Sequence, residues 1–237
     1  MATGTGTRAA PPYAVTAGEL ISDVRVALDD GAAAAWSDAE LLGFLAEAVR
    51  EYSQHLPRVG EAALVAVAGQ RRYALPWDAA AVTAVEYPLD REPPAYLTRL
   101  PYKSRRFDGH RHGHYGHGHY DVLLSHDLTR PPELLLGFDP DAGETLVARY
   151  LHPHESDLAA DTYLTVPADH HHVLIQYVLF AAARQLQARE QTAPTNNSGL
   201  LMAQLAANTR RLELAWLNAL NRILYHRLGA GEIVVWS

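Results

Sequence analysis

Residues 36–52 read WSDAELLGFLAEAVREY, and this stretch decides how the rest of the chain is interpreted. Ser37 stands three residues before Glu40, which is the capping-box pattern that begins a helix. The apolar positions that follow share one helical face: Leu41, Phe44, Leu45, Ala48, Val49 and Tyr52. Leu56-Pro57 ends the pattern, because proline cannot continue a helix. The stretch therefore predicts an amphipathic helix whose apolar face packs against other helices.

Helical patterns also precede and follow this stretch. Thr16 and Glu19 form a second capping box, and the helix they begin is expected to end at Asp29-Asp30-Gly31. A third helix is predicted after Pro167, running to about residue 190, because proline is favoured at or just before a first helical turn. A fourth is predicted from residue 197 or 198 to about 228, with leucines along one side.

The middle of the chain has a different periodicity. Residues 58–166 are rich in β-branched residues, proline, glycine and histidine, and their apolar runs are short. Gly69-Gln70 separates two such runs and predicts a hairpin. The other predicted strands are 82–87, 120–124, 133–138 and 144–150. Six or seven short strands favour a small sandwich or an open barrel.

The order helices, strands, helices predicts an α+β fold: a bundle of about four helices with an inserted, small β-sandwich or barrel-like domain. The predicted parts are a flexible N-terminal arm (1–15), a helical domain (16–57 and 167–228), the inserted β domain (58–166) with a histidine- and glycine-rich loop (108–119), and a C-terminal tail (229–237).

Composition excludes several classes of function. The chain has 237 residues, of which 48% are apolar and 20% charged, with a formal net charge of −7. It contains no cysteine, which excludes a disulfide framework, a thiolate nucleophile and a cysteine-based metal site. Proteins that bind DNA phosphates tightly are usually basic, so the negative charge argues against tight DNA binding. The sequence contains no run of about 18 apolar residues, so no membrane span is predicted. The N-terminus lacks signal-peptide character.

One cluster of residues could carry metal chemistry. Five histidines lie within ten residues: His110, His112, His114, His117 and His119. Imidazoles this close together can ligate zinc, nickel or copper, but a metal site also needs rigid supporting partners. The glycines between the histidines favour a surface loop, and a pH-sensitive contact is a further alternative. His170-His171-His172 point in different directions on a helix and so cannot form one ligand set.

The C-terminal residues form a second candidate site. The glycines of Gly229-Ala230-Gly231 precede Ile233, Val234, Val235 and Trp236, an apolar run that is costly to leave in water. The run either adds a strand to the chain's own β domain or docks on another chain by strand addition. No nucleophile elbow, phosphate loop or dinucleotide fingerprint is present, so the sequence predicts neither an enzyme nor a cofactor.

The whole pattern resembles the head–tail adaptor, or connector, proteins of tailed bacteriophages and gene transfer agents. The opening helix, residues 19–30 (ELISDVRVALDD), and the WSDAEL stretch carry the resemblance first. The β region follows with residues 73–76 and 82–87, and residues 164–169 (LTVPAD) then lead into the long third helix. The likeness covers most of residues 16–228 and rests on packing and capping patterns. The histidine-rich stretch has no counterpart in the family pattern.

The resemblance implies a structural protein of the virion neck, assembled in the host cytoplasm. It implies a homo-oligomeric ring, commonly a dodecamer, that sits below the portal protein, extends the DNA channel and docks the tail or tail-completion proteins. Double-stranded DNA would pass through the lumen without sequence-specific binding, and no membrane or cofactor is implied. Family members often grip the portal with a C-terminal segment, a role that Ile233, Val234, Val235 and Trp236 match by position and character.

Two alternatives stay open at this point. One is another neck, tail-completion or tail-tube component of the virion. The other is a metal-binding protein or metal-dependent enzyme that uses the stretch from His110 to His119.

Overall fold

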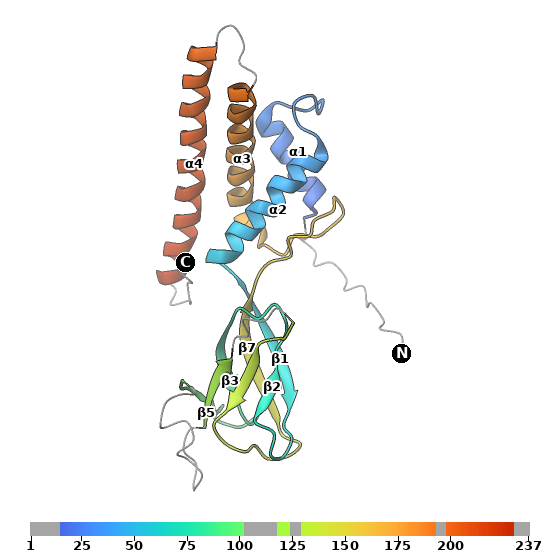
Figure 1. Cartoon of the computed structure of the whole chain (residues 1–237), viewed down its shortest axis with the longest axis vertical. Helices are drawn as coiled ribbons and strands as arrows, with labels where there is room; N and C mark the ends of the chain where they lie inside the picture. The colour runs from blue at the N-terminus through green and yellow to red at the C-terminus, as the bar shows by residue number, and fades with distance from the viewer. Residues whose placement is uncertain (1–14, 102–117, 124–128, 193–197, 230–237) are drawn as a thin grey trace. The chain divides into compact units, whose positions relative to one another are not determined.

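The computed structural model describes residues 15–101, 118–123, 129–192 and 198–229 (Figure 1). Two helices come first, seven strands follow, and two further helices end the described chain. The α+β fold class predicted from the sequence is confirmed. The chain divides into two compact units: a helical unit, up to Leu56 and from His154 onward, and a β unit, Pro57–Pro153. None of the described helices combines the length and apolarity needed to span a bilayer.

The helical unit contains four α-helices and one short 3₁₀ helix. They are α1 (Ala17–Leu28), α2 (Asp38–His55), the 3₁₀ turn Ala168–His170, α3 (His171–Thr192) and α4 (Ser198–Gly229). Both predicted capping boxes are present: Thr16 with Glu19 at α1 and Ser37 with Glu40 at α2. Asp29 ends α1 in the left-handed conformation, with φ of 55°. Local sequence signals therefore fix the starts of both N-terminal helices.

The helical core is built around α3. Its buried face (Val173, Leu174, Tyr177, Val178, Ala181 and Ala182) packs with the buried faces of α1 and α2. Among the side chains of α4 whose burial is described (201–226), the buried ones lie toward its end, where Leu220, Ile223 and Leu224 enter the core. Its earlier described side chains are half-buried or exposed, and α3 is the helix against which α4 mainly packs. One neighbouring helix covers too little of α4 to bury the whole stripe.

The β unit contains two small sheets that enclose one core. Its strands are β1 (Arg58–Val65), β2 (Arg72–Ala74), β3 (Ala81–Glu86), β4 (Thr98–Arg99), β5 (His119–Leu123), β6 (Glu133–Leu136) and β7 (Thr145–His152). The sheets have the orders β1-β7-β3 and β2-β6-β5-β4. All described pairings are antiparallel except β4 with β5. Buried side chains of both sheets form a single apolar cluster, as in a small sandwich.

The predicted hairpin around Gly69-Gln70 is wrong. The strand before the turn, β1, pairs with β7 over eight residues, and the strand after it, β2, pairs with β6 in the other sheet. The turn is closed by a side chain: the Tyr73 hydroxyl accepts from the Val67 amide and donates to the Gln70 carbonyl. A long ladder with β7 satisfies more backbone groups than a hairpin with the three-residue β2 would.

The predicted end of the β domain at residue 166 also differs from the structure. Residues 154–166 belong to the helical unit, where they lie along the first turn of α1. The amides of Ala17 and Gly18 donate to the carbonyls of Thr162 and Ala160, at 2.9 and 2.8 Å. The first amides of a helix lack partners within it. This segment supplies such partners, and is thereby tied to the helices.

Candidate interaction surfaces

Most residues predicted as sites lie outside the part of the chain that the structure describes. They are the docking residues Ile233, Val234, Val235 and Trp236 and the histidines His110, His112, His114 and His117. His119 is described: it is the first residue of β5, and it is half-buried. The docking and metal assignments therefore stay predictions.

The described histidines take part in local packing. Within the described ranges, no group of three or more His, Asp or Glu side chains is arranged to hold a metal ion. The rings at 170, 171 and 172 diverge. His170 is hydrogen-bonded to the Tyr52 hydroxyl at 2.6 Å, while the other two donate to the carbonyls of Val166 and Asp169. These contacts fasten the start of α3 to α2 and to the preceding segment.

His154 joins the two points at which the chain leaves and re-enters the helical unit. Its amide donates to the Ser53 hydroxyl at 3.0 Å, and its ring Nε2 lies 3.1 Å from the Leu56 carbonyl oxygen. A carbonyl only accepts, so Nε2 carries the proton. Nδ1 of His154 is hydrogen-bonded to the Thr165 hydroxyl at 3.1 Å, and this hydroxyl also accepts from the Glu155 amide. Both nitrogens of the buried ring therefore have a hydrogen-bond partner.

The contacts of His154 with Ser53 and Leu56 were not predicted from the sequence, although two prolines indicate where the chain leaves and re-enters the helical unit. Pro57 and Pro153 flank the β unit, and proline marks element ends. Leu56 ends α2, and His154 is the first residue of the returning helical segment. The pairing of Ser53 with His154 spans 101 positions. No local pattern predicts such a long-range contact.

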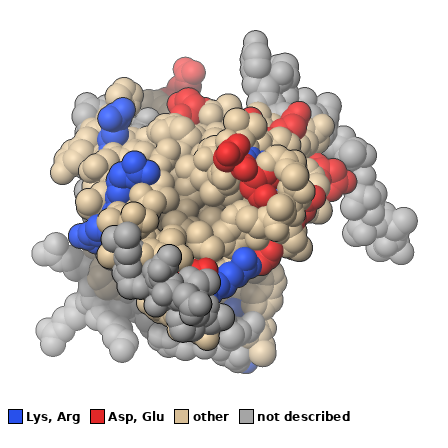
Figure 2. All heavy atoms as spheres, turned by 90° about the horizontal axis from the view of Figure 1, so that it is seen from above, with Lys and Arg blue, Asp and Glu red and all other residues tan. Residues whose placement is uncertain are grey.

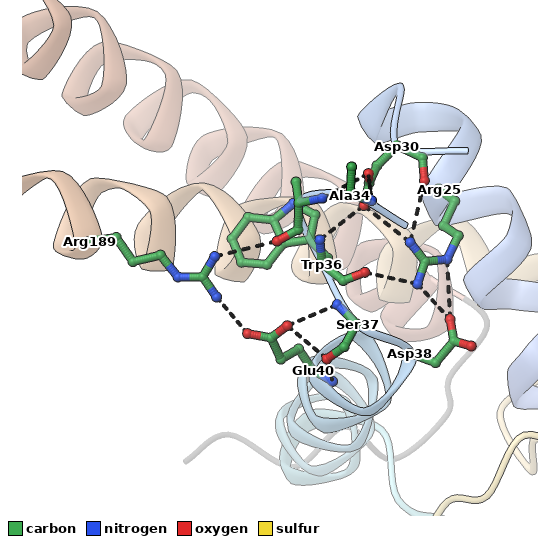
Figure 3. Close-up of polar contacts among 9 residues, drawn as sticks. Arg25, Asp30, Ala34, Trp36, Ser37, Asp38, Glu40 and Arg189 are labelled. Atoms are coloured by element: carbon green, nitrogen blue, oxygen red, sulfur yellow. Dashed lines mark hydrogen bonds and ion pairs between the residues drawn. The ribbon is translucent and has the colours of Figure 1, made fainter. Parts of the chain in front are cut away.

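A second polar cluster shapes the corner between α1 and α2 (Figure 3). The Arg25 guanidinium donates to the Asp30 carboxylate at 3.1 Å, to the Trp36 carbonyl at 3.0 Å and to the Asp38 carboxylate at 2.6 Å. The Asp30 carboxylate also accepts from the amides of Ala34, Ala35 and Trp36. The Asp30 side chain is 6% exposed. This carboxylate holds the turn between the helices in one conformation.

The same contacts explain the acidity of Asp30. Hydrogen bonds from the Ala35 amide first, and then from the amides of Ala34 and Trp36, stabilise the carboxylate, and Arg25 adds a favourable charge. Together they lower the pKa of Asp30 below its ordinary value, although burial opposes them. The corner is therefore built for an ionised aspartate.

Arg189 connects the far end of α3 to this corner. It donates to the Glu40 carboxylate and to the Ala35 carbonyl, and its guanidinium lies 4.6 Å from the centre of the Trp36 ring (Figure 3). Trp36 is buried and meets Phe44 edge to face. Cation–π and ion-pair contacts from one arginine thus fix α3 against the start of α2.

Charges are distributed unevenly over the helical unit. Figure 2 shows Lys and Arg side chains gathered on one side of the viewed face and most Asp and Glu side chains on the other. Two acidic side chains, Glu19 and Asp23, are exposed on α1. The described part of α4 instead carries exposed arginines: Arg210, Arg211 and Arg222. Two helices of one unit therefore present opposite charge.

The β unit exposes an edge of a different character. β1 forms one edge of its sheet, and its side chains alternate between half-buried and exposed positions. Val59 and Val65 are exposed on it, with 66% and 64% of their surfaces accessible. Within the described residues no further strand pairs with this edge. A long edge strand with exposed valines is a template on which another strand can pair.

Comparisons with known proteins identify the pattern as a whole. Residues 15–227 match the family model described as SU10 adaptor protein. The match spans the helices of the helical unit and the entire β unit. No curated protein matches the chain.

Proposed function

Because the chain belongs to the SU10 adaptor protein family, a family of phage head–tail adaptors, we propose that it is a ring-forming component of the virion neck. Membership supports a phage adaptor role and a structural part in the virion. The proposal is that identical copies form a ring, a dodecamer in its simplest form, below the portal protein. This ring extends the DNA channel and offers the tail a docking surface.

The observation that carries the proposal is the extent of the family match. It covers residues 15–227 and so includes the capped helices, the inserted β unit and the long α3–α4 pair. A local motif can occur in unrelated proteins, but an agreement over this order of elements concerns the whole architecture. Charge adds support: a net charge of −7 suits a channel through which DNA must slide.

The C-terminal residues Ile233, Val234, Val235 and Trp236 complete the proposal as the portal-docking segment. Their β-branched and aromatic side chains suit strand addition to another protein. The Gly229 and Gly231 backbones before them allow the segment to leave the helix direction.

Electron microscopy of a mixture with the cognate portal protein tests the ring. We expect additional ring-shaped density on the portal, with the same rotational order in most particles. Portal particles without added density, at concentrations where the chain is in excess, would contradict the proposal.

Co-sedimentation with the portal tests the docking segment separately. Deleting residues 232–237, or introducing Ile233→Asp with Val235→Asp, should release the chain from the portal. Removing Ser237 alone is the matched control and should leave co-sedimentation unchanged. Undiminished binding of the deletion variant would remove this role from the segment while leaving the ring proposal in place.

A further inference from the structure

The exposed face of α4 combines arginines with apolar side chains. Four residues of α4 lie within one narrow arc of the helix, because Leu214, Arg222 and Tyr225 follow Arg211 by 3, 11 and 14 residues. Leu214 is 43% exposed and Tyr225 is 71% exposed. The buried residues of α4, such as Ile223, lie on the opposite side. We call these four residues the α4 face.

The two arginines of this face have no ion pair within the described chain. Arg210, by contrast, is neutralised by Glu213 one turn away. Arg211 and Arg222 are 11 residues apart, which corresponds to about 16 Å along the helix. The α4 face therefore offers two separated positive charges with exposed apolar surface between and beyond them.

The exposed face of α1 has the complementary composition. Glu19, Ser22, Asp23 and Val26 follow helical spacing and form what we call the α1 face. Val26 is 82% exposed, which is the highest value among the large apolar side chains described as exposed. Asp29 extends the acidic charge just past the helix, so that the acids span about 15 Å. This length matches the spacing of the two arginines.

The two faces lie on different flanks of α3. α3 packs against both α1 and α4, and Figure 1 shows α4 on one flank of it, with α1 and α2 on the other. The α1 face and the α4 face of one copy therefore point away from the core separately. A contact between them joins two copies, and because the two surfaces differ it is head-to-tail and can close a ring.

Like charges disfavour the other pairings between copies. An α4–α4 contact would place arginines against arginines, and an α1–α1 contact would place carboxylates against carboxylates. On these grounds, and resting on the ring proposed above, we propose that the α4 face of each copy packs against the α1 face of the next. Arg211 and Arg222 meet the acids of α1, and Leu214 and Tyr225 cover Val26.

Charge reversal on each face tests this contact. The α4-face variant is Arg211→Glu with Arg222→Glu. The α1-face variant is Glu19→Gln with Asp23→Arg and Asp29→Asn, because glutamine keeps the capping box of α1 and asparagine suits the left-handed conformation of residue 29. Arg50→Glu on the exposed side of α2 is the control, since it changes charge away from both faces. Far-UV circular dichroism establishes that each variant is folded before assembly is measured.

Ring formation on the portal, counted by electron microscopy, is the readout. For each face variant alone, the number of portal-bound rings should fall by about tenfold or more, because like charges then meet at every contact. The control should assemble like the wild type. An equal mixture of the two face variants should restore rings, since every contact in an alternating ring again joins opposite charges.

The outcomes separate this contact from the ring itself. A wild-type chain that forms no ring overturns both proposals. Wild-type rings that persist in both variants overturn only the α4–α1 contact, as does a loss of rings that mixing does not restore. The alternative binding partner of the α4 face is the phosphate backbone of DNA. If the α4-face variant loses retardation of a short duplex in gel shift but keeps its rings, DNA is the occupant and the contact is overturned.

Discussion

The same substitution, glycine to alanine, should have opposite effects at two positions of the helical unit. Gly18 lies in the first turn of α1, and a Cβ added there would stand 2.9 Å from the Ala160 carbonyl oxygen. Gly43 lies on the exposed side of α2, and a Cβ added there would meet nothing within 4 Å. The pair therefore separates helix propensity from packing, using one chemical change.

The magnitudes follow from these two environments. In an exposed helix interior, alanine is favoured over glycine by about 0.5–1 kcal/mol, so Gly43→Ala should stabilise by that amount. At Gly18 the added methyl group meets backbone and not the end of a flexible side chain. Relief requires α1 to move from residue 160, which stretches the 2.8 Å hydrogen bond from the Gly18 amide. Overpacking of this kind costs about 1–3 kcal/mol and outweighs the gain in propensity.

Urea unfolding followed by the far-UV circular dichroism of the helices, all of which lie in the helical unit among the described residues, measures both effects. We expect the midpoint to rise for Gly43→Ala and to fall for Gly18→Ala, with m unchanged in each. If the urea midpoint of Gly18→Ala equalled that of Gly43→Ala, the result would refute the close approach of residues 158–163 to α1.

Three further predictions concern the cores and the titrating groups. Leu174 is fully buried at the centre of the helical core, and Leu174→Ala should cost about 2–5 kcal/mol in urea unfolding; a loss below about 1 kcal/mol would contradict this placement. The lowered pKa of Asp30 means that its contribution to stability is present above the ordinary carboxyl pKa and is lost as pH falls, so Asp30→Asn should flatten the acid-side decline of the urea midpoint. Burial and a hydrogen bond with Glu144 raise the pKa of Tyr87 to about 12, so stability should fall between about pH 10 and 12, where the unfolded state ionises first. Ultraviolet titration should show one late-ionising tyrosine fewer in Tyr87→Phe than in the wild type, in which burial also raises the pKa of Tyr120 and Tyr177.

The helices could be predicted from the sequence because their signals are local. Thr16 and Ser37 each cap a helix with a glutamate three residues later, and both boxes form in the structure. The apolar spacing that follows Ser37 matches the buried positions of α2 from Leu41 to Tyr52. Such signals depend on residues within one helical turn, so no tertiary information is needed to interpret them.

The strand pairings could not be predicted because their partners are distant in the chain. Arg58 pairs with His152 and Val65 with Thr145, so the first and last strands of the β unit are neighbours. The alternation of β1 shows which residues share a face, but the same alternation suits any partner. The two charged faces escaped prediction for a related reason. The pattern of α4 defines its outer side, whereas its separation from α1 depends on how both helices pack on α3.

The clamp around His154 explains how one chain can carry a second fold between α2 and α3. An inserted domain leaves its host undisturbed when its entry and exit points lie together, since no host element then has to stretch. Here the Leu56 carbonyl and the Ser53 hydroxyl both bind His154, so the chain returns to the point at which it left. The helical unit, with the two faces proposed to join neighbouring copies, can thus keep its geometry whatever length of chain the insertion contains. A variant such as Ser53→Ala should therefore weaken the helical unit locally while preserving the register of β1 with β7, because that ladder is held by backbone hydrogen bonds of its own.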